Sequence, residues 1–186
     1  MIFQCVLLAL SASIDALALG LTYGVKNTKM STMSNIIIFT IVFISSSVSV
    51  LVGHYISILF SPTFSVFLGS SLLILLGLYN IYKAIYIPNK SKNFDIDNSN
   101  NIDNKEAIAL GIAIAVDASC VSLSSGVIGF GTVILPIFMA TFHTLFVNCG
   151  NYITKSITQK INVSQNILAI LSGILLIFLG LSKIIF

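Results

Sequence analysis

Two aspartates lie in the middle of apolar segments, where an ionised carboxylate is costly. Asp15 occurs in SASIDALALGLTYG and Asp117 in IAIAVDASCVSLSSGV, and no Lys or Arg lies mid-segment to neutralise them. On insertion scales an ionisable group at mid-membrane costs at least about 2.5–3.5 kcal/mol, so such groups usually face a cavity or a partner. Two neighbouring carboxylates repel each other unless a cation or proton lies between them. The pair therefore predicts a cation site or a proton relay. Protonated aspartates that join helices by hydrogen bonds are the alternative.

Three further polar residues in apolar segments are candidate helpers of the aspartates. Ser46 and His143 hold equivalent positions, each seven residues before the glycine of a matching motif, Gly53 in GHYI and Gly150 in GNYI. An imidazole can ligate a transition metal or move a proton, although a histidine that only packs between helices is an equal alternative. Asn148 offers an amide oxygen to a cation, or a hydrogen bond to a neighbouring helix.

The composition predicts the elements that must position these residues. Of the 186 residues, 56% are hydrophobic and 8% charged, whereas soluble domains carry about a quarter charged residues. The basic residues are all lysines in short loops, which argues against a nucleic-acid partner. A membrane helix needs about 20 predominantly apolar residues. Six segments qualify: roughly 2–25, 35–60, 64–87, 106–128, 130–152 and 165–186.

The lysines predict the orientation of these segments. Eight of the nine lie in or beside the loops that follow the first, third and fifth segments: Lys26, Lys29, Lys83, Lys90, Lys92, Lys105, Lys155 and Lys160. The positive-inside rule makes these loops cytoplasmic. Both termini of the chain are then expected outside the cell.

The two halves of the chain match each other in order. LSASIDALALGLTYGV (10–25) matches IAIAVDASCVSLSSGV (112–127), and LGSSLLILLGLYNIY (68–82) matches LSGILLIFLGLSKII (171–185). Each half, 1–87 and 106–186, holds three spans, so the second half is inverted. Inverted repeats build transporters whose sites lie near the bilayer midplane at the repeat interface. We therefore predict an all-α fold of six transmembrane helices in two inverted three-helix repeats, with Asp15 and Asp117 facing each other.

The loop 88–105, which joins the two repeats, leads into a segment that resembles a calcium-binding loop. DIDNSNNIDNKE (95–106) follows the EF-hand pattern of oxygen ligands, with Asn100 in place of the usual glycine. The predicted ligands are Asp95, Asp97, Ser99, Asn101, Asp103 and Glu106. Calcium bound here would couple its cytosolic level to the helix that carries Asp117. A flexible Asn/Asp-rich linker that matches only by composition is the alternative.

Motifs of enzymes and ATP-driven pumps are absent from the sequence. There is no GxxxxGK[ST] motif, no nucleophile with a positioned base and no cofactor motif. Cys5, Cys120 and Cys149 show no CxxC pair or zinc spacing and are expected to pack as buried thiols. The chain is thus predicted to be no enzyme, to need no resident cofactor, and to couple any transport to protons or the membrane potential.

SASIDALALGLTYGVK and LGIAIAVDASCVSL resemble the MntP/YtaF family, small bacterial six-span membrane proteins with an Asp in the first span of each repeat. The resemblance covers essentially the whole chain. It implies a Mn²⁺ exporter of the bacterial cell membrane that uses Asp15 and Asp117. The manganese exporters also have an acidic residue in their second span, where this chain has Ser46. LGLTYGVK is closer to the YtaF branch, which is named for sporulation.

These observations leave three hypotheses for the function. The first is a secondary transporter that exports a divalent cation, since hard oxygen ligands suit Mn²⁺, Mg²⁺ or Ca²⁺ better than copper or zinc. The second is a sporulation-associated membrane protein with structural aspartates and a calcium-sensing loop. The third is an exporter of small amino compounds, whose ammonium group would pair with the carboxylates. The expected partners are the lipid bilayer and the cation, and a homodimer is compatible with the size of the chain.

Overall fold

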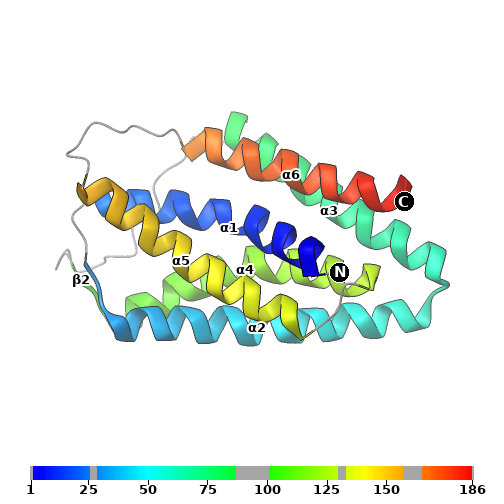
Figure 1. Cartoon of the computed structure of the whole chain (residues 1–186), viewed down its shortest axis with the longest axis horizontal. Coiled ribbons are helices and arrows are strands. Elements are labelled where there is room, and N and C mark those ends of the chain that lie inside the picture. Colours follow the sequence, from blue (N-terminus) through cyan, green and yellow to red (C-terminus); the bar gives the residue numbers. More distant parts are fainter. Residues whose placement is uncertain (1, 26–28, 87–100, 130–132, 157–164, 186) are drawn as a thin grey trace.

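The computed structural model describes residues 2–25, 29–86, 101–129, 133–156 and 165–185, which form a helical bundle with one small sheet (Figure 1). The helices are α1 (Ile2–Val25), α2 (Thr32–Leu59), α3 (Pro62–Tyr86), α4 (Asn104–Ile128), α5 (Ile134–Ser156) and α6 (Gln165–Ile185). The strands are β1 (Lys29–Met30) and β2 (Asn101–Ile102). The prediction of an all-α membrane protein is confirmed.

Five of the described helices, α1 to α5, are long and apolar enough to cross a membrane. Among its described residues α6 has a shorter apolar stretch, Ile170–Ser182, so a sixth span stays a prediction. The fifth segment differs most from expectation, because α5 begins at Ile134 and continues to Ser156 rather than covering 130–152. Pro136 falls in the first turn of α5, where a missing backbone N–H breaks no helical hydrogen bond.

Local capping chemistry sets the ends of α2 and α4. The Ser31 hydroxyl accepts a 3.1 Å hydrogen bond from the Ser34 N–H at the start of α2. At the start of α4 the Glu106 carboxylate accepts a 3.2 Å bond from the Asp103 N–H, as in a capping box. Gly129 ends α4 at a φ of 90°, a left-handed conformation that favours glycine.

The helices pack chiefly as three pairs, α1 with α5, α2 with α4 and α3 with α6, and each pair joins the two halves of the chain. Glycines bring the paired backbones together. Gly53 and Gly126 oppose each other between α2 and α4, as Gly77 and Gly173 do between α3 and α6. A Cβ atom at Gly150 would lie 2.6 Å from the Leu17 carbonyl oxygen. Membrane helices use such small residues for close approach.

The helices alternate in direction along the chain. The N- and C-termini lie at one end of the bundle, together with the connection between α2 and α3, the end of α4 and the start of α5 (Figure 1). The other end holds the parallel pair β1–β2, in which Met30 pairs with Ile102. The Ser34 hydroxyl donates a 2.7 Å hydrogen bond to the Ile102 carbonyl. This end therefore ties the segment after α1 to the start of α4.

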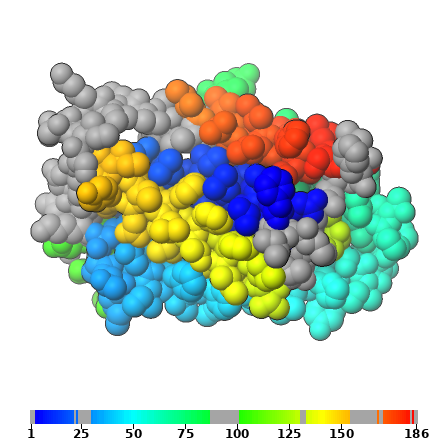
Figure 2. Space-filling view, in the orientation of Figure 1, coloured from blue at the N-terminus to red at the C-terminus, as the bar shows by residue number. Residues whose placement is uncertain are grey.

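The outer surface of the bundle is apolar. On the face shown in Figure 2, helices α2, α5, α1 and α6 form adjacent bands. Large apolar side chains of α2 and α3 point outward; Ile44, Val48 and Phe67 are each more than half exposed. By contrast, most of the buried polar residues among the described ones are serines. Soluble monomers rarely expose large contiguous apolar patches, so this surface suits lipid.

The close contact of α2 with α4 predicts a position-specific cost of adding one methyl group. In Gly126→Ala the new Cβ would meet the backbone carbonyl of Val50, which cannot move without parting the helices. We expect a loss of about 1–3 kcal/mol in stability, measured by thermal melting of the helical circular dichroism in detergent. Gly111→Ala is the control on the same helix, because the nearest atom there is the mobile tip of Ile41, at 3.0 Å. Equal destabilisation by both variants would contradict the packing argument.

Candidate cation-binding site within the membrane helices

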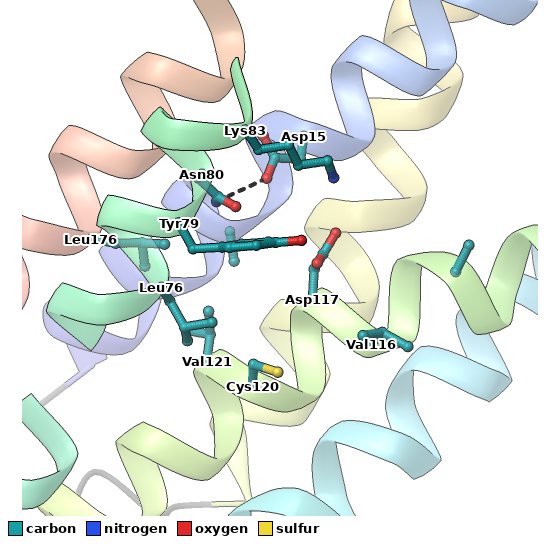
Figure 3. Close-up of a pocket in the computed structure, with 12 residues that line it drawn as sticks. Asp15, Leu76, Tyr79, Asn80, Lys83, Val116, Asp117, Cys120, Val121 and Leu176 are labelled. Carbon is teal, nitrogen blue, oxygen red and sulfur yellow. Dashed lines mark hydrogen bonds between the residues drawn. The ribbon is translucent and has the colours of Figure 1, made fainter. Parts of the chain in front are cut away.

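Asp15 of α1 and Asp117 of α4 line one pocket of about 300 Å³. The rest of the wall comes mainly from α3 and α4, with Leu176 of α6 (Figure 3). Asp15 lies near the middle of α1 (Ile2–Val25), and Asp117 lies near the middle of α4 (Asn104–Ile128). Both carboxylates therefore originate near the middle of apolar helices and open into the same space.

Asp15 is held by donors from two other helices. The Ser172 hydroxyl of α6 donates a 3.0 Å hydrogen bond to Oδ1 of Asp15. The Asn80 side-chain amide of α3 donates a 3.3 Å bond to Oδ2 and lies 3.5 Å from the Ser172 hydroxyl. Each carboxylate oxygen thus receives a hydrogen bond, and the two bonds fix the orientation of the group.

Asp117 stands on the opposite wall of the pocket and is more exposed than Asp15. Tyr79 projects from α3 into the pocket with its phenol oxygen on the side of Asp117 (Figure 3). Cys120 follows Asp117 by three residues, so both side chains lie on one face of α4 and line the pocket. The two aspartates therefore occupy different surroundings in one site.

Lys83 also lines the pocket, although no lysine lies mid-segment in the sequence. From its position in the sequence, Lys83 is expected in or beside the loop after the third segment. In the structure α3 continues to Tyr86, and Lys83 follows Asn80 by three residues on the pocket side. The spacing of Leu76, Asn80 and Lys83 in LGLYNIYK is the signal that could have placed all three on one helical face. No comparable spacing in the sequence predicts the contacts of Ser172 with Asp15 and Asn80.

The cysteine prediction was right for one residue and wrong for two. Cys5 is buried, whereas Cys120 and Cys149 are exposed. Cys120 faces the pocket because it shares the face of Asp117, and Cys149 lies on the outer side of α5. A small apolar residue type does not by itself reveal which face of a helix it occupies.

The three candidate helpers lie outside the aspartate pocket. The His143 Nδ1 lies 2.9 Å from the Ser13 hydroxyl and 2.8 Å from the Met139 carbonyl oxygen, at the contact of α1 with α5. Asn148 exchanges two amide hydrogen bonds with Asn35, of 3.1 and 3.2 Å. Ser46 is fully buried in α2, and its hydroxyl has no hydrogen-bond partner among the described residues. These positions face other helix contacts, since helix pairing turns them away from Asp15 and Asp117.

The structure describes only half of the predicted calcium ligands. Asp95, Asp97 and Ser99 lie outside the described residues. Asn101 belongs to β2, and Asp103 and Glu106 form the capping box of α4. Within the described ranges, no group of three or more His, Cys, Asp or Glu side chains is arranged to hold a metal ion. Calcium binding by this loop stays a prediction.

Carboxylate, amide, hydroxyl and phenol oxygens are hard ligands that suit Mg²⁺, Ca²⁺ or Mn²⁺. Two carboxylates from different helices could bind such an ion from opposite sides, with water completing its shell. The fold and this pocket together define a polytopic α-helical membrane protein with a candidate site for a cation between its helices.

The chain belongs to the Mntp family, which is described as "Putative manganese efflux pump" and matches residues 1–80 and 51–185. It is also 27% identical over 205 residues to a protein of Bacillus subtilis (strain 168) named "Probable sporulation protein YtaF". That alignment covers 96% of this chain and 97% of the relative. No solved structure matches the chain.

The pocket predicts a difference in thiol reactivity between the two exposed cysteines. Cys120 lines a pocket that also holds two carboxylates and an ammonium, whereas Cys149 faces outward among apolar side chains. Methanethiosulfonate reagents attack the thiolate, which forms in water and not in lipid. In membrane vesicles we expect Cys120 of the Cys149→Ser variant to react at least about tenfold faster than Cys149 of the Cys120→Ser variant. Equally slow labelling of both would show that water does not reach the pocket.

Proposed function

We propose that this protein is a secondary transporter that exports a divalent metal cation, with Mn²⁺ as the favoured substrate. The observation that carries the proposal is the pocket in which Asp15 and Asp117 meet, between helices that are otherwise apolar. Even with the Lys83 ammonium in the pocket, two ionised carboxylates leave one negative charge that needs a further positive charge. A transported cation supplies this charge, and the description of the family favours manganese.

The donor set supports a hard divalent ion. Asp15 is already oriented by Ser172 and Asn80, so its carboxylate would lose little freedom on binding. Asp117 faces the same space with fewer neighbours around it. The sulfur of Cys120 also lines the pocket, but oxygen atoms dominate the polar lining. This balance favours Mn²⁺ over copper or zinc.

The transport proposal includes a fold of two inverted three-helix repeats. If the two halves exchange places, α1 corresponds to α4, α2 to α5 and α3 to α6. The α1–α5 pair then becomes the α4–α2 pair, and the α3–α6 pair stays the same. The three main packing pairs agree with this exchange. In the α3–α6 contact, Gly77 abuts the Gly173 carbonyl and Gly180 abuts the Ser70 carbonyl. These two contacts exchange under the register that aligns 68 with 171. Such repeats allow one half to rock against the other around a central site.

The proposed orientation places the β1–β2 end of the bundle in the cytoplasm. Both termini lie at the opposite end (Figure 1), so they would face outside the cell. Lys105 lies in the first turn of α4, which directly follows β2, and Lys83 lies in the last turn of α3. The positive-inside rule supports this arrangement.

The test is the manganese content of cells that express the protein under manganese load. Wild type is expected to lower cell manganese, and Asp15→Asn and Asp117→Asn are each expected to lose at least about 90% of this effect, because either change removes a ligand charge at the site. Asp103→Asn is the matched control: Asp103 caps α4 outside the pocket, and Asn caps as well as Asp. All variants are compared at equal membrane abundance. Unchanged export by both pocket variants would refute the proposed site.

The second candidate function is a sporulation-associated membrane protein in which the aspartates are structural. The observation in its favour is the hydrogen-bonded link from Asp15 to α3 and α6, together with the name of the Bacillus subtilis relative. This role predicts that Asp15→Ala lowers the free energy of unfolding by about 1–3 kcal/mol. The abundance and the melting temperature of the protein should fall accordingly. Wild type would then leave cell manganese unchanged, which separates this function from transport.

A further inference from the structure

Lys83 shares the pocket with both aspartates and is the only basic residue among the described residues that line it. It lies beside Asp15 (Figure 3). Both Lys83 and Asp117 are close enough to Asp15 for their charges to act on its carboxylate. With both carboxylates ionised, the two negative charges and the ammonium leave the pocket with one net negative charge.

The face of α3 that carries Lys83 differs from the face that meets lipid. Tyr82 and Tyr86 are 56% and 70% exposed, and their rings lie 5.0 Å apart on the outer side of the helix. Tyrosines of this kind anchor helices at the membrane interface. Lys83 is only half exposed and lines the pocket instead. A lysine whose only role was to extend to the lipid headgroups could lie on the lipid-facing side of α3, as Tyr82 and Tyr86 do.

We propose that the Lys83 ammonium is a tethered counter-ion of the aspartate pocket, which an incoming divalent cation must displace. This inference rests on the proposed function, since it assumes that the pocket binds the transported cation. A cation held between Asp15 and Asp117 would repel an ammonium in the same pocket. The flexible four-carbon stem of lysine lets the ammonium move aside. Asn80 and Ser172 would keep Asp15 oriented while Lys83 leaves.

A tethered counter-ion gives the transporter two properties. It weakens cation binding, so a cation bound on one side of the membrane can be released on the other. It also neutralises part of the unloaded site, so the protein can return without a bound ion. Replacement of Lys83 by a neutral residue should therefore strengthen binding and slow export, whereas loss of an aspartate should abolish both.

The test measures Mn²⁺ binding to the purified full-length protein by equilibrium dialysis in detergent, at fixed pH and low salt. Lys83→Met is expected to bind Mn²⁺ at least about tenfold more tightly than wild type, because one repelling charge leaves the site. Lys83→Arg keeps the charge and is expected to bind as weakly as wild type or more weakly. Lys105→Met removes an exposed lysine at the start of α4, outside the pocket, and is expected to change affinity less than about twofold.

The outcomes separate this inference from the function on which it rests. If Asp15→Asn and Asp117→Asn abolish Mn²⁺ binding but Lys83→Met binds no tighter than wild type, the counter-ion role is wrong and the cation site stands. Weaker binding by Lys83→Met would also overturn it, since the ammonium would then support the site. If neither wild type nor Lys83→Met binds Mn²⁺, the proposed function fails and the counter-ion role fails with it. Melting by circular dichroism shows that each variant is folded.

Discussion

The cost of placing carboxylates inside a membrane is the constraint on which the rest of this structure depends. Asp15 and Asp117 stand near the middle of long apolar helices, where an ionised carboxylate is costly, so the protein must supply their surroundings. It does so with hydrogen-bond donors from α3 and α6 and with a pocket that both side chains share. The outer surface can then be apolar, because the main polar demand is met inside the bundle.

Close backbone contact makes this arrangement feasible. Glycines at the α1–α5, α2–α4 and α3–α6 contacts let the two halves of the chain interlock rather than stand apart. Asp15 and Asp117 belong to different halves, so only interlocked halves bring them to one pocket.

The two aspartates are equivalent in the sequence repeat but not in the pocket. Under the register that aligns 68 with 171, Asn80 corresponds to Lys183 and Ser172 to Gly69. The residue types that orient Asp15 are therefore not repeated at the equivalent positions of the other half. The surroundings also differ in burial, because Asp117 is more exposed than Asp15. Lys83 adds a third charge on the side of Asp15, which increases the asymmetry.

The sequence by itself determined the apolar helices, the two mid-helix aspartates and the match between the halves, because periodicity, composition and the cost of charge in lipid act locally along the chain. Helix packing decided which faces meet. It brought Asn80, Lys83 and Ser172 to Asp15, and turned Ser46, His143 and Asn148 toward other contacts. The capping bond between Asp103 and Glu106 is local by contrast, because the two residues are three apart in the sequence. Side-chain partners depend on helix rotation and on the pairing of distant segments, and a single sequence does not encode these in any local pattern.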